Sequence, residues 1–382
     1  MEWRVPLSDI DFGAEEEAAV LQILRGRWLT MGAVTQAFEE EFAAYVGARH
    51  AIAVTNGTAA LHLACLAVGL QPEDEVILPS LTFLATANAV RYTRATPVFA
   101  DIESQHDLDI SPASIEQQLT KRTRAIMVMH YGGYACDMPR IMALAKAHGL
   151  AVIEDAAHAI GSVLEGRKMG TWGDVGCFSF FSNKNMTTGE GGMLVTDNDS
   201  LAEKLRILRS HGMTTMTWDR HQGHAWSYDV VELGYNYRID ELRAALGRVQ
   251  LGKLEQNNER RRHITALYRG YFQELVPSVI VPFSQPRGVS SCHILPILLP
   301  VESDRAGFME RMKSHQIQTS IHYPPVHKFR TYTEINKHPS ILPMTEEIAS
   351  REVTLPLYPA LTDEGVTAVV QAVRDTLREA SD

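Results

Sequence analysis

Residues 176–192 constrain the fold most, because they place one lysine directly after an apolar strand. The stretch 177–181 is short and aromatic, as a buried strand would be, and 193–196 is a second apolar strand. Between them lie Lys184 and a glycine-rich turn. Lysines are almost never fully buried unless paired, and a desolvated amine becomes a nucleophile near neutral pH. Lys184 is therefore either an exposed loop lysine, as its type alone favours, or a reactive amine.

The rest of the first 200 residues alternates apolar strands with helical segments. Together with the two strands around Lys184, five further strands make seven, at 50–54, 75–78, 96–100, 125–130 and 151–153. Strands joined through helices by short links predict an α/β fold with a mostly parallel seven-stranded sheet covered by helices.

The C-terminal third predicts a smaller α+β domain. We expect strands at 293–299 and 317–323 and helices at 304–314 and 363–379, arranged as a mixed sheet with helices on one side. A long helix opening after Gly234 and ending near Arg262 connects the two parts. The predicted domains are a large one at 1–250, with the N-terminal helices, and a small one at 251–382.

Polar groups follow several predicted strands, at the edge where ligands bind in parallel sheets. Gly57 and Thr58 turn from a strand directly into a helix, which favours a bound phosphate or is a simple helix cap. Phe83 follows the next strand. Asp155 ends the strand at 151–153 and is either a helix cap or a functional acid, and His158 would share its helical face or be structural.

Composition excludes several other classes of protein. The net charge of −10 over 382 residues argues against a nucleic-acid partner, and no apolar run is long enough for a membrane helix. Four cysteines lie far apart without metal-ligand spacing, so we expect free thiols and a cytoplasmic protein without a secretion signal. His211, His221 and His224 lack a carboxylate or cysteine at ligand spacing, so no metal site is predicted.

A phosphate turn, an aromatic ring, an acid and a lysine, each placed after a strand, are what pyridoxal 5′-phosphate (PLP) requires. Its phosphate takes N–H and hydroxyl donors, and its ring lies against an apolar face. Its pyridine nitrogen needs a carboxylate, and its aldehyde needs a lysine.

At these residues the chain resembles the DegT-like sugar aminotransferase family, which comprises fold-type I PLP enzymes. The resemblance covers about residues 4–378, and its most specific part runs from Ser179 through Lys184 to Gly192. The matching stretches are 28–32, 56–60, 79–83, 154–158, 178–192, 234–240 and 355–359.

The resemblance implies a role for each cofactor contact. Lys184 would form the Schiff base and move the proton, and Asp155 would pair with the pyridine nitrogen. Phe83 would stack on the ring, and His158, where many members carry glutamine, would reach its 3-hydroxyl. The implied phosphate cradle consists of Gly57, Thr58 and Ser179.

The resemblance also implies a homodimer with shared active sites. Asn236 would reach the phosphate bound by the neighbouring subunit, and Arg238 would join this contact, bind substrate or form a structural ion pair. Expected substrate contacts are Thr30, for which plain packing is the alternative, and His322 and Tyr323 of the small domain. The polar loop 213–230 is a second candidate for the opening that takes the nucleotide end of the substrate, and dimer packing is the alternative for this loop and for the segment that contains His322 and Tyr323.

The implied reaction moves an amino group from L-glutamate to the ketone of a nucleotide-linked keto-sugar, for which we expect an NDP-4-keto-6-deoxyhexose. An NDP-3-keto-sugar or an aminocyclitol ketone is the alternative. The related sugar 3-dehydratases carry histidine at the lysine position, and a non-catalytic regulator of the same fold would lose Lys184 or Asp155; both residues are present here. A nicotinamide-dependent oxidoreductase would need Gly-x-Gly-x-x-Gly after the first strand, whereas the stretch 55–60 has one glycine.

Overall fold

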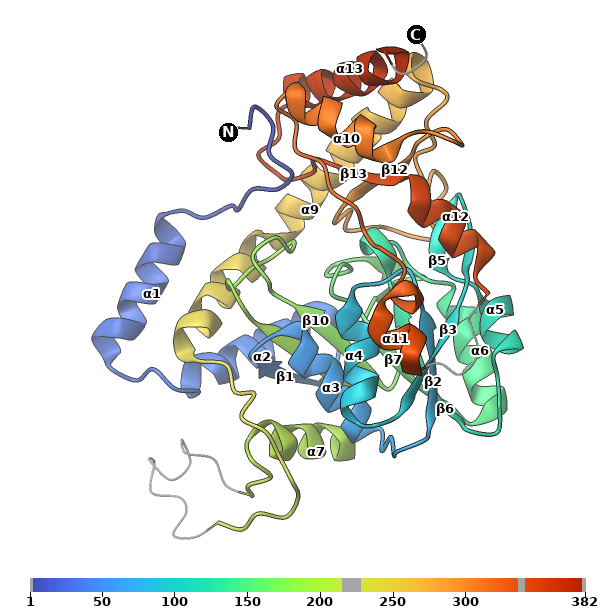
Figure 1. The fold of residues 1–382 in the computed structure, drawn as a ribbon. Coiled ribbons are helices and arrows are strands. Elements are labelled where there is room, and N and C mark those ends of the chain that lie inside the picture. Colours follow the sequence, from blue (N-terminus) through green and yellow to red (C-terminus); the bar gives the residue numbers. More distant parts are fainter. Residues whose placement is uncertain (1–2, 215–227, 336–340, 380–382) are drawn as a thin grey trace.

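A seven-stranded sheet forms the centre of the computed structural model, which describes residues 3–214, 228–335 and 341–379 (Figure 1). Its strand order is β1-β11-β10-β7-β6-β2-β3. All pairs within β10-β7-β6-β2-β3 are parallel, and β11 is antiparallel to both of its neighbours, so the mostly parallel sheet is confirmed. In chain order the strands are β1 (His50–Val54), β2 (Glu75–Pro79), β3 (Thr96–Ala100), β6 (Thr123–Met129), β7 (Ala151–Asp155), β10 (Val175–Ser179) and β11 (Gly192–Thr196).

Helices cover both faces of this sheet because its side chains are apolar on both faces. Along β1, Ile52 and Val54 pack with α3, α4 and α7, whereas Ala51 and Ala53 pack with the cluster around α2 and α6. Strands that are buried on both faces read as continuous apolar runs, which is why their positions could be predicted. These helices are α2 (Ala33–Val46), α3 (Gly57–Ala67), α4 (Leu84–Tyr92), α6 (Met138–His148) and α7 (Asp199–Arg209).

The remaining elements lie around this core. Short hairpins and helices of the large part are α1 (Ala14–Gly26), β4 (Ile102–Ser104), β5 (Asp107–Ile110), α5 (Pro112–Gln117), the 3₁₀ turn Tyr131–Gly133, β8 (Val163–Leu164) and β9 (Arg167–Lys168). The C-terminal part contains β12 (Leu295–Leu298), α10 (Arg305–Ser314), the 3₁₀ turn Val326–Lys328, α11 (Arg330–Ile335), α12 (Pro343–Arg351), β13 (Glu352–Leu355) and α13 (Asp363–Glu379).

The C-terminal part differs from the prediction in its sheet. β12 pairs antiparallel with β13, a strand that the sequence analysis did not predict. The expected strand at 317–323 is wrong: among the described residues this segment forms only single bridges, from Ile317 to Val5 and from Ser320 to Thr354. The segment instead leads His322 and Tyr323 toward the large part, where both line a cavity.

A 35-residue helix, α9 (Glu241–Leu275), joins the two parts and extends well beyond the predicted end near Arg262 (Figure 1). Leu254 packs in a core cluster of the large sheet, whereas Ile264 and Tyr268 pack in the core cluster that contains β12 and β13. The buried Arg261 guanidinium donates to the carbonyl oxygens of His293 at 3.1 Å and Leu357 at 2.8 Å. We propose that the boundary between the predicted domains 1–250 and 251–382 lies within this helix.

The first residue of α9 also holds the start of α2. The buried Glu241 carboxylate accepts hydrogen bonds from the backbone N–H groups of Gly32, Val34 and Thr35, at 2.9, 2.9 and 2.8 Å, and from the Thr35 hydroxyl at 2.6 Å. A carboxylate near a helix N-terminus also interacts favourably with the helix dipole. This interaction ties residues that lie more than 200 positions apart in sequence.

We expect Glu241→Gln to lower the free energy of unfolding by about 2 kcal/mol, because its amide group would face N–H donors that now bind an oxygen. Urea denaturation followed by circular dichroism measures this change. The control is Glu40→Gln, an exposed residue of α2, which should change stability by less than about 0.5 kcal/mol. Equal effects in the two variants would show that the Glu241 contacts contribute little.

Candidate active site

A cavity of about 420 Å³ lies where several strands of the large sheet end, and the small part closes one side of it. Nine residues singled out from the sequence line it together: Gly57, Thr58, Phe83, Asp155, His158, Ser179, Lys184, His322 and Tyr323. They come from five separate stretches of the chain. Because β1, β2, β7 and β10 run in the same direction, the residues that follow them meet at one edge of the sheet.

Lys184 and Asp155 provide the opposite charges in this cavity. Burial lowers the pKa of Lys184 to about 8, and the nearby carboxylate of Asp155 opposes that shift. Burial raises the pKa of Asp155, while hydrogen bonds and the charge of Lys184 act in the other direction. The Asp155 carboxylate accepts from the Thr86 hydroxyl at 2.8 Å and from the Ala157 N–H at 3.2 Å, so its orientation is fixed. Near pH 8 a substantial fraction of Lys184 is therefore a free amine.

His158 is buried and held from both sides. Its Nδ1 accepts a hydrogen bond from the Gly132 N–H at 3.3 Å, and its Nε2 lies 2.9 Å from the Tyr323 hydroxyl. Since Nδ1 is an acceptor, the proton of the neutral ring is on Nε2. Burial, with a contribution from Lys184, holds the pKa of His158 well below its usual value. The ring is thus a neutral donor at the cavity.

The start of α3 offers donors for an anion. Asn56 caps this helix by accepting from the Ala59 N–H at 2.8 Å, and among the described residues neither Gly57 nor Thr58 has an acceptor for its own N–H. A side chain at position 57 would place its Cβ 2.8 Å from the Cβ of Ser179, so only glycine allows this close approach. Two free N–H groups at a helix N-terminus beside a serine hydroxyl are the donors that a bound phosphate requires.

Phe83 contributes an apolar face to the same cavity. Half of its surface is exposed, and its ring centroid lies 5.8 Å from that of Tyr323. Lys184, Asp155, the N–H cradle and this ring together meet the four requirements of PLP, so the residues present fit that cofactor.

Three predicted site residues lie outside the lining of this cavity. Thr30 is exposed and forms a bridge with Asp240, and Asn236 is exposed and forms a bridge with Ser210. Arg238 is partly buried and bridges to Val54, and burial lowers its pKa. Within one chain none of these three side chains completes the cavity. The predicted loop 213–230 also cannot be placed against it, because residues 215–227, including His221 and His224, lie outside the described part.

Some lining or supporting residues were not predicted. Glu190 lines the cavity, and its place in the stretch 176–192 was the available signal. Thr86 follows Phe83 at helical spacing and orients Asp155. His293 packs against the His158 ring at 4.2 Å between centroids, and nothing in the local sequence indicates that contact.

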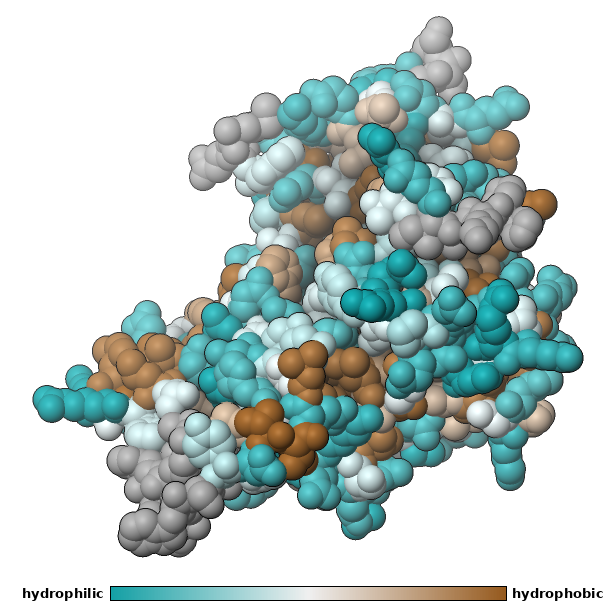
Figure 2. Space-filling view, turned by 60° about the horizontal axis from the view of Figure 1, so that its bottom comes forward, coloured by the Kyte–Doolittle hydropathy of each residue, from teal (hydrophilic) through white to brown (hydrophobic). Residues whose placement is uncertain are grey.

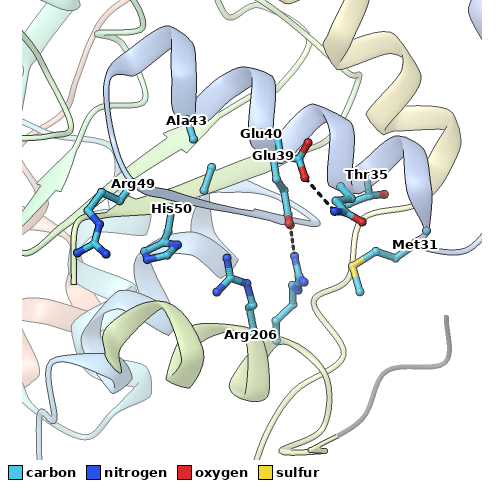
Figure 3. A pocket seen from close by; sticks show the side chains of 12 residues that line it. Met31, Thr35, Glu39, Glu40, Ala43, Arg49, His50 and Arg206 are labelled. Atoms are coloured by element: carbon cyan, nitrogen blue, oxygen red, sulfur yellow. Dashed lines mark hydrogen bonds and ion pairs between the residues drawn. The ribbon is translucent and has the colours of Figure 1, made fainter. Parts of the chain in front are cut away.

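A second cavity, of about 390 Å³, lies between α2 and α7 (Figure 3). The side chains of Arg49, His50 and Arg206 gather at it, but its charges are largely paired within the chain. The Glu39 carboxylate forms an ion pair with the Arg209 guanidinium at 2.5 Å, and the Asp199 carboxylate forms one with the Arg49 guanidinium at 2.9 Å. It contains neither a lysine nor a helix N-terminus with free N–H groups, so we place the chemistry in the first cavity.

Other expectations were tested over the described residues only. All four cysteines are buried and free, as predicted. In those same residues there is no group of three or more ligand side chains arranged for a metal ion. None of the helices in the described part of the chain is both long and apolar enough to cross a membrane.

Known proteins resemble this chain over nearly its whole length. The model of the DegT/DnrJ/EryC1/StrS aminotransferase family matches residues 11–374. The spore coat polysaccharide biosynthesis protein SpsC of Bacillus subtilis is 42% identical over 376 residues, which cover 96% of each chain.

Solved structures agree with this match. PseC of Helicobacter pylori, an aminotransferase involved in the biosynthesis of pseudoaminic acid, has a TM-score of 0.91 at 28% identity and covers 99% of this chain and 100% of its own. Spr1654 of Streptococcus pneumoniae, solved in its PLP form, has a TM-score of 0.91 at 26% identity, with coverages of 98% and 99%. The cofactor of the family is PLP. The chain belongs to the DegT/DnrJ/EryC1/StrS aminotransferase family and is a PLP-dependent sugar aminotransferase.

Proposed function

We propose that this enzyme moves an amino group from L-glutamate to the ketone of a nucleotide-linked keto-sugar, specifically an NDP-4-keto-6-deoxyhexose. The observation that carries the proposal is Lys184, a partly deprotonated amine beside Asp155 and a phosphate cradle in one cavity. SpsC and PseC take part in the biosynthesis of a polysaccharide and of pseudoaminic acid, and this supports a sugar substrate. An NDP-3-keto-sugar or an aminocyclitol ketone is the second candidate.

The proposed cofactor contacts follow from positions in the cavity. Gly57, Thr58 and Ser179 would hold the phosphate of PLP, and Phe83 would lie against its ring. The Asp155 carboxylate, fixed by Thr86 and the Ala157 N–H, would keep the pyridine nitrogen protonated. Bound PLP supplies an aldehyde that forms a Schiff base with an amine and a ring that accepts electrons from the reacting carbon.

Lys184 would perform the proton transfer. As a neutral amine it can take the proton from the α-carbon of L-glutamate and later return one to the carbon of the sugar that receives the amino group. His158 donates from Nε2 and stays neutral, so it can bind an oxygen anion of the cofactor without competing for this proton. The Asp155 carboxylate would stabilise the positive charge on the protonated pyridine nitrogen of PLP.

We also propose a homodimer in which each site takes residues from both subunits. Asn236 and Thr30 are exposed and lie outside the cavity of their own chain, as residues that serve a neighbour would. Exposed apolar side chains occur in the same regions of the chain. They are Leu21 and Leu24 of α1, then Leu29, and then Val230, Val231 and Leu233 before α9. Figure 2 shows apolar patches on one face of the molecule, one of them on the left, where α1 lies. Burial of such side chains favours association.

The cofactor and the amino donor can be tested by absorption. We expect the purified protein with PLP to show a near-visible band that collapses when L-glutamate is added, and the band to be absent or altered in Lys184→Ala. Lys168→Ala is the matched control, because burial also lowers the pKa of Lys168 but this residue does not line the cavity. Failure of the protein to take up PLP would reject the assignment, whereas a band that is stable in L-glutamate would reject only this donor.

The pH dependence of cofactor uptake tests the amine itself. Because only neutral Lys184 can attack the aldehyde, the rate of uptake should rise roughly tenfold per pH unit below the pKa of about 8 and level off above it. Stopped-flow absorbance with PLP-free protein measures this profile. A rate that continues to rise toward pH 10.5, the ordinary pKa of lysine, would show that the cavity does not perturb the amine.

Shared sites can be tested by mixing two inactive variants. Lys184→Ala and Asn236→Ala are each expected to lose most activity. After the subunits are exchanged, hybrid dimers would contain one intact site, and about one quarter of wild-type activity should return. Recovery would not occur if Asn236 served the site of its own chain, and full activity of Asn236→Ala alone would remove this residue from the site.

A further inference from the structure

A chain of hydrogen bonds leads from the cavity into the core of the small part. The first member is His322, which lines the cavity. The ring Nδ1 of His322 lies 2.8 Å from the Thr354 hydroxyl oxygen. That oxygen lies 2.6 Å from Oε1 of Glu352, and Oε2 of the same carboxyl accepts the His322 backbone N–H at 2.9 Å. Thr354 and Glu352 are each only 1% exposed. The buried carboxyl is thus connected to the cavity through two polar groups.

This chain can hold its protons in two ways. With Glu352 ionised, the Thr354 hydroxyl donates to the carboxylate and accepts from Nδ1–H of His322, which leaves Nε2 as an acceptor. With Glu352 protonated, the two bonds between side chains reverse: the carboxylic acid donates to Thr354, Thr354 donates to Nδ1, and Nε2 carries the proton. The two arrangements differ by one proton on the chain and need no change in the position of any heavy atom.

We propose that His322, Thr354 and Glu352 form a proton relay that removes a proton from an ammonium group in the cavity. The His322 Nε2 takes that proton, the Nδ1 proton passes to Thr354, and the hydroxyl proton of Thr354 passes to Glu352. The ammonium becomes a neutral amine and the carboxylate becomes a carboxylic acid, so protons and charge balance. The relay rests on the proposed function, since an amine must be neutral before it forms a bond to carbon.

The surroundings of the relay favour protonation of the Glu352 carboxyl over protonation of the His322 imidazole. Burial and the charge of Lys184 lower the pKa of the His322 imidazole to about 4, whereas burial raises the pKa of Glu352 to about 8. The imidazole therefore passes a proton on more readily than it keeps one.

The other groups near the relay are mostly uncharged. The Tyr131 hydroxyl donates to the His322 carbonyl oxygen, and burial keeps the pKa values of Tyr131 and Tyr323 high, so both remain neutral. His158 and His293 lie close enough to be influenced by His322, and burial lowers the pKa of both. Arg305 of α10 donates to the Glu352 backbone carbonyl at 3.3 Å, and its charge partly opposes the shift at the carboxyl.

The test is to measure which nitrogen of the His322 ring carries the proton, by nitrogen NMR of the ¹⁵N-histidine-labelled full chain with PLP. His322→Gln identifies the ring signals by their loss. Between about pH 6 and pH 10 the wild-type proton should move from Nε2 to Nδ1, with a midpoint near the Glu352 pKa of about 8. Glu352→Gln should abolish this exchange, because an amide cannot take up the proton.

Thr354→Val provides a second, less disruptive break in the relay, and Thr345→Val is its matched control. Thr345 also donates to a carboxylate at 2.6 Å, that of Asp101, but it does not line the cavity. We expect Thr354→Val to uncouple the ring from Glu352 and to slow the reaction with L-glutamate roughly 100-fold, as for loss of general acid–base catalysis. Thr345→Val should leave both measurements unchanged.

The results separate the relay from the proposed function. A wild-type ring whose protonated nitrogen does not change with pH, or an exchange that persists in both Glu352→Gln and Thr354→Val, overturns the relay. If the exchange persists in both variants, another group, such as Lys184, determines which nitrogen of the His322 ring carries the proton. An exchange that depends on Glu352 in a protein that L-glutamate does not convert supports the relay and rejects the donor.

Discussion

The cavity depends on the electrostatic cost of burying Lys184. An amine taken out of water loses hydration and favours its neutral form, whereas the carboxylate of Asp155 favours the charged form. Burial is the larger effect and Asp155 only partly opposes it, so the pKa of the amine falls from 10.5 to about 8 and both forms exist near neutral pH. An exposed lysine would be almost entirely charged, and without the Asp155 carboxylate the pKa of the buried amine would be lower still. The close packing around both groups maintains this balance.

The sheet explains why so much of this site could be predicted. Its strands are buried on both faces, so the sequence shows them as short apolar runs, and the parallel direction follows from the alternation with helices. Once the direction is known, the residues after Val54, Pro79, Asp155 and Ser179 must meet at one edge. Gly57, Phe83, Asp155 and Lys184 do meet there. Their roles toward PLP came from resemblance and remain proposals for this chain.

The remaining features depend on contacts between distant residues, for which the local sequence has no signal. The helix α9 was predicted to end near Arg262, yet it continues to Leu275, and the guanidinium of Arg261 is buried against the backbone carbonyls of His293 and Leu357. The stretch 317–323 alternates like a strand but finds a pairing partner at only two positions among the described residues. His293 and Glu352 look like ordinary polar residues until tertiary packing brings His293 against the His158 ring and Glu352 against the backbone of His322.

The helix α9 belongs to both cores, and this has a mechanical consequence. It measures about 52 Å, since each residue of an α-helix adds about 1.5 Å, and a hydrogen-bonded rod of that length resists bending. One end is tied to α2 through Glu241, and the other packs in the core against which Tyr323 lies. The two parts of the chain that line the cavity are therefore joined by one long helix. A substitution that bends the middle of α9 would widen or narrow the cavity without touching any residue that lines it.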